Sequence, residues 1–106
     1  MAGMGNLSGL MQQAQKMQRD LQRLQAELKE RMVEGSAADG AIKVIASGDQ
    51  RVMSVRLDSS VVDPDDTETL EDLLIIAVNS ALDKARQLQK DETEKVTGGL
   101  NIPGMF

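Results

Sequence analysis

The chain has 106 residues, a formal net charge of -5 and a single aromatic residue, Phe106. This length suits one domain, whose core must be built from Leu, Ile, Val, Ala and Met. The absence of Cys excludes disulfides and thiolate chemistry, and the absence of His removes the usual general base and the commonest metal ligand. The sequence shows neither a transmembrane run nor a signal peptide, so we expect a cytoplasmic protein with no membrane partner.

Charge is distributed unevenly along the sequence. Residues 1–33 hold five bases and three acids, and residues 41–57 hold three bases and one acid, whereas residues 58–72 hold seven acids and no base. Because the Debye length at physiological salt is about 8 Å, a ligand responds to the nearest patch more than to the total charge. The negative total therefore does not exclude an anionic partner.

The first predicted element is a long helix over about residues 7–32. Its apolar residues step by three and four in alternation, which is the heptad spacing of a helix seam. They are Leu7, Leu10, Ala14, Met17, Leu21, Leu24 and Leu28. A helix of about 25 residues is about 40 Å long, whereas a compact domain of this size has a radius of gyration of about 13 Å. The helix should therefore protrude or be covered by a second subunit, and both point to an oligomer.

Three strands are predicted over about residues 32–57. The stretch MVEGSAADG indicates a short strand followed by a turn of small residues, and AIKVIAS and QRVMSVRLD are rich in β-branched residues. Between the last two, Gly48 and Asp49 match a two-residue hairpin loop in which Gly48 would take a positive φ. We therefore expect a three-stranded antiparallel sheet.

A second helix is predicted over about residues 67–97. The acids around Pro64 suit its N-terminus, and its broad apolar face should cover the sheet. It should end at Gly98 and Gly99, with residues 98–106 as a flexible apolar tail. The fold class is thus α/β of the α+β type, with one domain over residues 1–97 in the order helix, three strands, helix. The expected core residues are Ile42, Val44, Val55, Leu57, Leu74, Val78 and Leu82.

The sequence shows no motif for catalysis or metal binding. Gly3, Gly5 and Gly9 do not have the spacing of a phosphate-binding loop, and no strand precedes them, so a flexible terminus is the better interpretation. A calcium loop starting at Asp63 would need Gly at position 68 and Glu at position 74, and the chain has Glu and Leu there. Without a nucleophile motif, we expect no enzymatic activity, no metal and no cofactor.

The strongest functional candidate is the stretch QQAQKMQRDLQRLQ, residues 12–25. Lys16, Arg19 and Arg23, here called the basic stripe, lie at i, i+3 and i+7, so their side chains share one helix face away from the apolar seam. Lys and Arg supply charge for phosphates, and the Gln residues beside them supply neutral hydrogen-bonding groups. The stripe covers about 10 Å, the reach of a few phosphates along one strand.

Composition alone also allows the basic stripe to be an ordinary solvated face of a coiled coil. With one aromatic residue, the chain has effectively no means of stacking bases, which argues against a single-strand platform. A nucleic-acid partner would therefore be duplex, held through its backbone with little sequence readout.

Four stretches occur in order along the chain: a Gly/Met-rich start leading into NLSGLMQQAQKMQ, the pair DG before the strand pair, LDSSVVDPDDTETLEDLLIIAVNSALDKA, and the closing GLNIPGMF. In this order and spacing the chain resembles, nearly end to end, the YbaB/EbfC family of bacterial nucleoid-associated DNA-binding proteins. The resemblance implies a tweezer-like homodimer whose protruding helices grip duplex DNA with low or modest sequence preference. Carried over by position, the DNA contacts would fall on Lys16, Arg19, Arg23 and Lys29. Asp20 departs from this pattern because it interrupts the basic run.

We therefore expect a nucleoid-associated protein that binds duplex DNA as a homodimer through backbone contacts from its N-terminal helices. Nucleoid organisation and gene expression are the processes that it would influence. The alternative is a dimeric scaffold or adaptor in which Leu21, Leu24 and Leu28 dock a partner protein. The salt dependence of binding distinguishes DNA binding from protein docking, because an apolar helix contact is nearly indifferent to salt.

Overall fold

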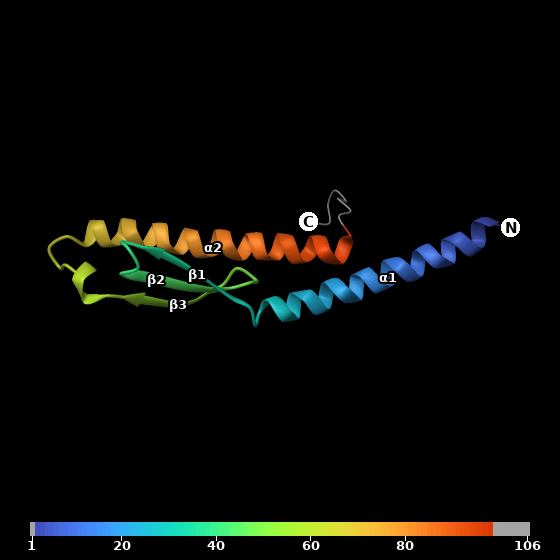
Figure 1. The fold of residues 1–106 in the computed structure, drawn as a ribbon, viewed down its shortest axis with the longest axis horizontal. Coiled ribbons are helices and arrows are strands. Elements are labelled where there is room, and N and C mark those ends of the chain that lie inside the picture. Colours follow the sequence, from blue (N-terminus) through green and yellow to red (C-terminus); the bar gives the residue numbers. More distant parts are fainter. Residues whose placement is uncertain (1, 99–106) are drawn as a thin grey trace.

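A computed structural model describes residues 2–98 of the chain. Its elements are α1 (Ala2–Leu28), β1 (Met32–Ala37), β2 (Ile42–Ser47), β3 (Val52–Leu57), the 3-10 helix η1 (Ser59–Val61) and α2 (Thr67–Thr97). The strands form one antiparallel sheet in the order β1-β2-β3 (Figure 1). The predicted α+β fold, with its order of helix, three strands and helix, is confirmed. The expected apolar tail lies outside the described residues from position 99 onward.

Helix α2 packs across one face of the sheet, over β1 and β2 (Figure 1). Its contact residues are small: Ala77, Ala81 and Ala85 are all completely buried. Beneath them lies Gly35 of β1, where an added Cβ would lie only 2.3 Å from the backbone nitrogen of Ala81. The alanines and this glycine therefore bring the helix backbone unusually close to β1.

Fewer of the predicted core side chains are buried than the sequence analysis expects, because those of β3 are exposed. Ile42 and Val44 of β2 are fully buried as expected, and Leu74, Val78 and Leu82 are partly buried against them. The predictions for Val55 and Leu57 are wrong, because these side chains are 46% and 40% exposed. The physical reason is the position of α2, which lies over β1 and β2 and leaves β3 uncovered.

The hairpin between β2 and β3 also differs from its prediction. The Ser47 carbonyl accepts from the Gln50 N–H at 2.9 Å, and the Ser47 N–H donates to the Arg51 carbonyl at 2.8 Å, which closes a three-residue loop. The residue with positive φ is Gln50, at 66°, and not Gly48. This arrangement is a turn followed by a left-handed residue, the next commonest hairpin after the two-residue loop.

Gly48 instead holds the end of α1. Its N–H lies 2.9 Å from the Leu28 carbonyl and 2.8 Å from the Arg31 carbonyl, and a Cβ there would lie 2.9 Å from the Leu28 side chain. Leu24 and Leu28 are buried at 5% and 0% exposure, so only the C-terminal end of α1 is fixed in the core. A glycine at position 48 is thus required by close approach and not by its φ.

The N-terminal part of α1 projects past the end of α2, and its C-terminal part lies beside the last turns of that helix (Figure 1). The helix begins at Ala2, so the residues expected to form a flexible terminus are helical. The radius of gyration is 20.2 Å and the longest extent 77 Å, against about 13 Å for the radius of a compact domain of this length. Residues 2–23 of α1 are called the arm below.

Both ends of α2 are capped. The Asp66 carboxylate accepts from the Thr69 hydroxyl at 2.6 Å and from the Thr69 N–H at 3.3 Å. These bonds, the hydroxyl bond first, hold the pKa of Asp66 below its ordinary value. At the other end Gly98, at a φ of 64°, donates its N–H to the Glu94 carbonyl, as a left-handed C-cap does.

Candidate nucleic-acid interface

The basic stripe lies on the solvent side of the arm. Lys16 and Arg23 have side chains 73% and 70% exposed, and Arg19 between them is also exposed. The spacing of i, i+3 and i+7 holds in α1, which is regular from Ala2 to Leu28. The structure therefore brings the three cations together on one helix face, turned away from the side that buries Leu24.

Asp20 lies between the cations of the stripe and pairs with two of them. The Lys16 Nζ is 3.0 Å from one carboxylate oxygen, and the Arg23 Nη1 is 3.9 Å from the other. Among the described residues, Arg19 has no ion-pair partner. Exposed ion pairs contribute about 0–1 kcal/mol, so an incoming phosphate can replace Asp20 as the counterion.

Lys29 does not belong to the helix that carries the stripe. The sequence predicts a helix to about residue 32, but α1 ends at Leu28 and Lys29 lies exposed in the turn that follows. The helix stops there because the Gly48 N–H bonds to the Leu28 and Arg31 carbonyls. Lys29 is thus placed at the base of the arm, beyond the three cations of the stripe.

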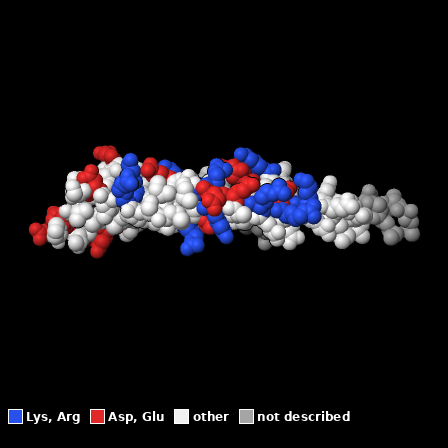
Figure 2. Space-filling model, turned by 90° about the horizontal axis from the view of Figure 1, so that it is seen from below, with Lys and Arg blue, Asp and Glu red and all other residues white. Residues whose placement is uncertain are grey.

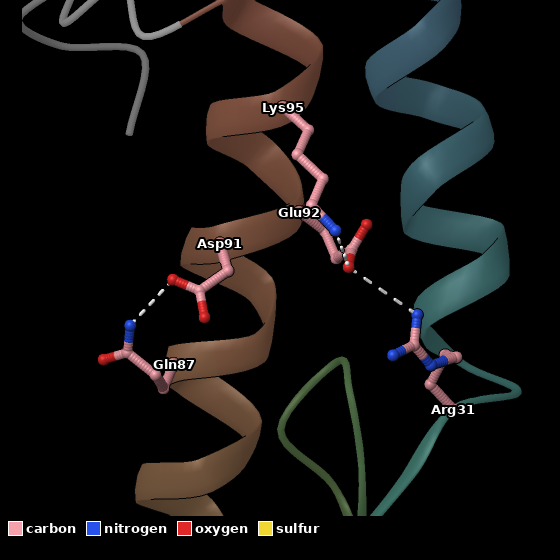
Figure 3. Close-up of polar contacts among 5 residues, drawn as sticks. All are labelled: Arg31, Gln87, Asp91, Glu92 and Lys95. Carbon is pink, nitrogen blue, oxygen red and sulfur yellow. Dashed lines mark hydrogen bonds and ion pairs between the residues drawn. The ribbon is translucent and has the colours of Figure 1, made fainter.

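Arg31 is a cation that the sequence analysis did not single out. Its Nη1 lies 3.8 Å from Glu92 of α2, and the same carboxylate accepts from the Lys95 Nζ at 3.1 Å (Figure 3). One turn away, Gln87 donates to Asp91 at 2.8 Å (Figure 3). The Arg31–Glu92 pair ties the base of the arm to α2, whereas the other two contacts lie within α2. Because Arg31 and Glu92 are distant in the sequence, no local pattern could have identified the pair.

Charge divides the molecule along its length. Figure 2 shows Lys and Arg side chains gathered over the middle of the molecule, beside a group of acids, with the far part of α1 uncoloured. That part, residues 2–15, contains no charged residue. The acidic loop of residues 58–66 lies at the opposite end of the molecule from the arm (Figure 1). Since exposed charges are screened beyond about 8 Å, this loop acts weakly on the stripe.

Leu21, Leu24 and Leu28, the part of the apolar seam expected to dock a partner protein in the alternative function, are largely buried within the fold. Leu24 and Leu28 are buried, and Leu21 is half-buried. The expectation that these residues dock a partner protein is therefore wrong for Leu24 and Leu28. The exposed part of the seam is its far end, where Leu7 and Leu10 are 59% and 61% exposed.

The described part of the chain shows no feature of a metal centre or of a membrane span. Within residues 2–98, no three His, Cys, Asp or Glu side chains come together as metal ligands would. None of the helices described is both long enough and apolar enough to cross a bilayer.

Comparisons with known proteins agree with this geometry. Residues 4–100 match the model of the YbaB/EbfC DNA-binding family. A nucleoid-associated protein from Acetivibrio thermocellus is 52% identical over 103 residues, which cover 96% of this chain and 91% of the relative. A nucleoid-associated protein from Alkaliphilus metalliredigens is 48% identical over 106 residues, covering 100% and 93%. The crystal structure of an uncharacterized protein from Helicobacter pylori shares the fold, with a TM-score of 0.72 at 20% identity, covering 87% of this chain and 94% of that one.

Proposed function

Because this chain belongs to the YbaB/EbfC DNA-binding family, we propose that it binds duplex DNA as a homodimer at the nucleoid. The observation that carries the proposal is the exposed basic stripe on a helix that projects from the folded body. A projecting helix with one cationic face can lie against a sugar-phosphate backbone without displacing the core. The folded body then serves to hold the arm at a fixed angle.

The contacts of this complex are to phosphates. Arg19 has no ion-pair partner among the described residues and is the first to meet the backbone, while Lys16 and Arg23 exchange Asp20 for phosphate oxygens. Lys29, in the turn at the base of the arm, contributes at the margin. Phosphate contacts fix position and carry little sequence information. Low or modest sequence preference follows, since no aromatic side chain is present on the arm to stack with bases.

Two arms give the dimer more contacts than one chain can make. Two stripes of three cations would neutralise about six phosphates, which corresponds to a slope of about -5 in a plot of log affinity against log salt concentration. Such binding is strong at low salt and fades toward physiological salt. A protein of this kind coats or bridges DNA and thereby influences nucleoid organisation and gene expression.

The test is fluorescence anisotropy of a labelled duplex titrated with three proteins. The Lys16/Arg19/Arg23→Ala variant should lose most of the binding, because it removes the stripe. The matched control is Lys43/Arg51/Arg56→Ala, which removes the same charge from exposed positions on the sheet and its hairpin. Circular dichroism establishes that both variants fold. Equal losses in the two variants would refute the stripe as the site and leave only a dependence on total charge.

A further inference from the structure

The far end of the apolar seam on α1 is uncovered within the part of the chain that the structure describes. Leu28 is buried, Leu21 and Met17 are half-buried, and Leu10 and Leu7 are 61% and 59% exposed. Leu10 lies about five turns before Leu28, so the two side chains occupy the same line of the helix. The face that packs in the body therefore continues, exposed, toward the free end of the arm.

The arm is helical although its own sequence favours a helix only weakly. Helix α1 is regular from Ala2, yet its first turns contain Gly3, Gly5 and Gly9, and glycine is among the poorest helix formers. Helices in proteins gain most of their stability from the packing of an apolar face, and isolated ones shorter than about 12–15 residues are marginal in water. The exposed seam is therefore a surface on which packing would stabilise the arm.

Helix α2 ends beside this seam. The two helices run antiparallel, and the last turns of α2 lie beside the C-terminal part of α1 (Figure 1). Thr97 is 3% exposed, and Gly98 closes α2 by donating its N–H to the Glu94 carbonyl. Because the helices are antiparallel, a chain that continues beyond α2 along its axis runs beside the arm toward the free end.

The next eight residues of the chain, residues 99–106, have the composition and the length to cover the exposed seam. Their sequence, GLNIPGMF, has no charged residue, and residues 2–15 of the arm have none either. Pro103 disfavours a helical continuation of α2. Extended, eight residues reach about 26–29 Å, whereas the distance from Met17 to Leu7 along the helix axis is about 15 Å. The large apolar residues of the segment are Leu100, Ile102, Met105 and Phe106.

We propose that residues 99–106, called here the C-terminal segment, pack on the exposed seam of their own arm, against Leu7, Leu10 and Met17. The segment is tethered at the end of α2, next to this surface, and a short tether gives an effective concentration of about millimolar. A segment from another molecule has to bind from solution at its own, lower concentration. The arm of the same chain is therefore the favoured partner.

This packing leaves the basic stripe free. Arg19 lies midway between Leu10 and Leu28 along α1, about two and a half turns from each, so it lies on the opposite side of the helix from both. The C-terminal segment would support the arm from the seam side, while the stripe side stays open to solvent. The proposal therefore goes beyond DNA binding and does not depend on it.

The first test uses the absence of cysteine in the chain. Under mild oxidation, a Leu10→Cys/Met105→Cys variant should form a disulfide within one chain, so that it loses its free thiols and keeps the chain mass of 11.5 kDa on a non-reducing denaturing gel. The matched control is Gln12→Cys/Met105→Cys, because Gln12 is exposed and lies about 160° around the helix from Leu10. This control should keep its free thiols. A disulfide between two chains, free thiols in the first variant or equal crosslinking of both would each overturn the proposal.

The second test measures amide hydrogen exchange in the arm. Changing the four large apolar residues of the C-terminal segment to Ser keeps its length and its charge, and the amides of residues 7–15 should then lose their protection. The amides of the sheet should keep theirs, which establishes that the variant folds. The control is Met53→Ser/Val62→Ser, which removes exposed apolar side chains far from the arm and should leave its exchange unchanged. Arm amides that exchange equally in wild type and in the four-residue variant would overturn the proposal.

Discussion

Replacing Asp20 with Asn should strengthen DNA binding. The Asp20 carboxylate lies 3.0 Å from the Lys16 Nζ and 3.9 Å from the Arg23 Nη1, and its side chain is 27% exposed. It therefore acts as an internal counterion that DNA phosphates must displace. Asparagine keeps the size of the side chain and removes the charge, so both cations become free to contact phosphate.

The size of the effect follows from the two ion pairs. Exposed pairs contribute about 0.2–1 kcal/mol each, and the longer of these two belongs at the lower limit. Their loss should release about 0.5–1 kcal/mol per arm and about 1–2 kcal/mol per pair of arms. Because 1.4 kcal/mol corresponds to a factor of ten in Kd, the variant should bind about 5- to 30-fold more tightly at low salt.

The assay is fluorescence anisotropy of a labelled duplex at low salt, with Glu27→Gln as the matched control. Glu27 is exposed on the same helix and forms no ion pair with any of the described residues, so its neutralisation should change the Kd less than about twofold. The reasoning is refuted if Asp20→Asn binds no more tightly than wild type. It is also refuted if the two variants gain affinity for the duplex equally, because the effect then depends only on total charge.

Three further predictions concern the scaffold that holds the arm. Gly35→Ala should destabilise the protein by about 3 kcal/mol or more, because its Cβ would lie 2.3 Å from the backbone of α2. Gly9→Ala is the control and should stabilise α1 slightly, because a Cβ there meets nothing within 4 Å. Chemical denaturation compares the free energies of unfolding of the two variants. Gly48→Ala should lower the free energy of unfolding by about 1–3 kcal/mol and weaken DNA binding, because its Cβ would collide with Leu28 at the base of the arm. Chemical denaturation measures the first effect and fluorescence anisotropy the second. Asp66→Ala should lower the melting temperature near neutral pH by removing the cap of α2, whereas Asp65→Ala should not. Because the folded-state pKa of Asp66 is lowered, its contribution is present above the ordinary value of 3.8 and should disappear as pH falls below it, so the two variants should converge in acid.

These predictions have separate contradicting results. Equal stabilities of the Gly35 and Gly9 variants would show that α2 does not approach β1 as described. A Gly48→Ala protein with unchanged stability would mean that the end of α1 is not fixed by the hairpin. A gap between the Asp66 and Asp65 variants that persists in acid would show that the ionised cap is not its cause.

Local pattern was enough to predict the types of the elements and the place of the basic stripe. The heptad spacing from Leu7 to Leu28 and the β-branched runs before and after Gly48 each specify one kind of element with little competition. The position of the basic stripe could be predicted from the sequence for the same reason, since three cations at i, i+3 and i+7 share a face in any regular helix.

Tertiary contacts decided what the sequence could not. Val55 and Leu57 alternate along β3 as core residues do. However, Gly35 and the alanines facing it let α2 pack closely on β1, which leaves β3 uncovered. No local sequence pattern predicts this position of α2. Gly48 occupies a turn, yet its glycine is required by the approach of Leu28 from another element. The ion pairs of Asp20 follow from helical spacing and could have been anticipated from Lys16 and Arg23, whereas that of Arg31 with Glu92 depends on the packing of α1 against α2.

The central claim is that the arms of a dimer hold a duplex by its phosphates, and the salt dependence of wild-type binding tests it most directly. Anisotropy titrations of one labelled duplex over a series of salt concentrations give the slope of log affinity against log salt. We expect binding at low salt with a slope between about -3 and -5, the steeper value requiring all six stripe cations at phosphates. No binding at low salt, or an affinity that hardly changes with salt, would contradict it.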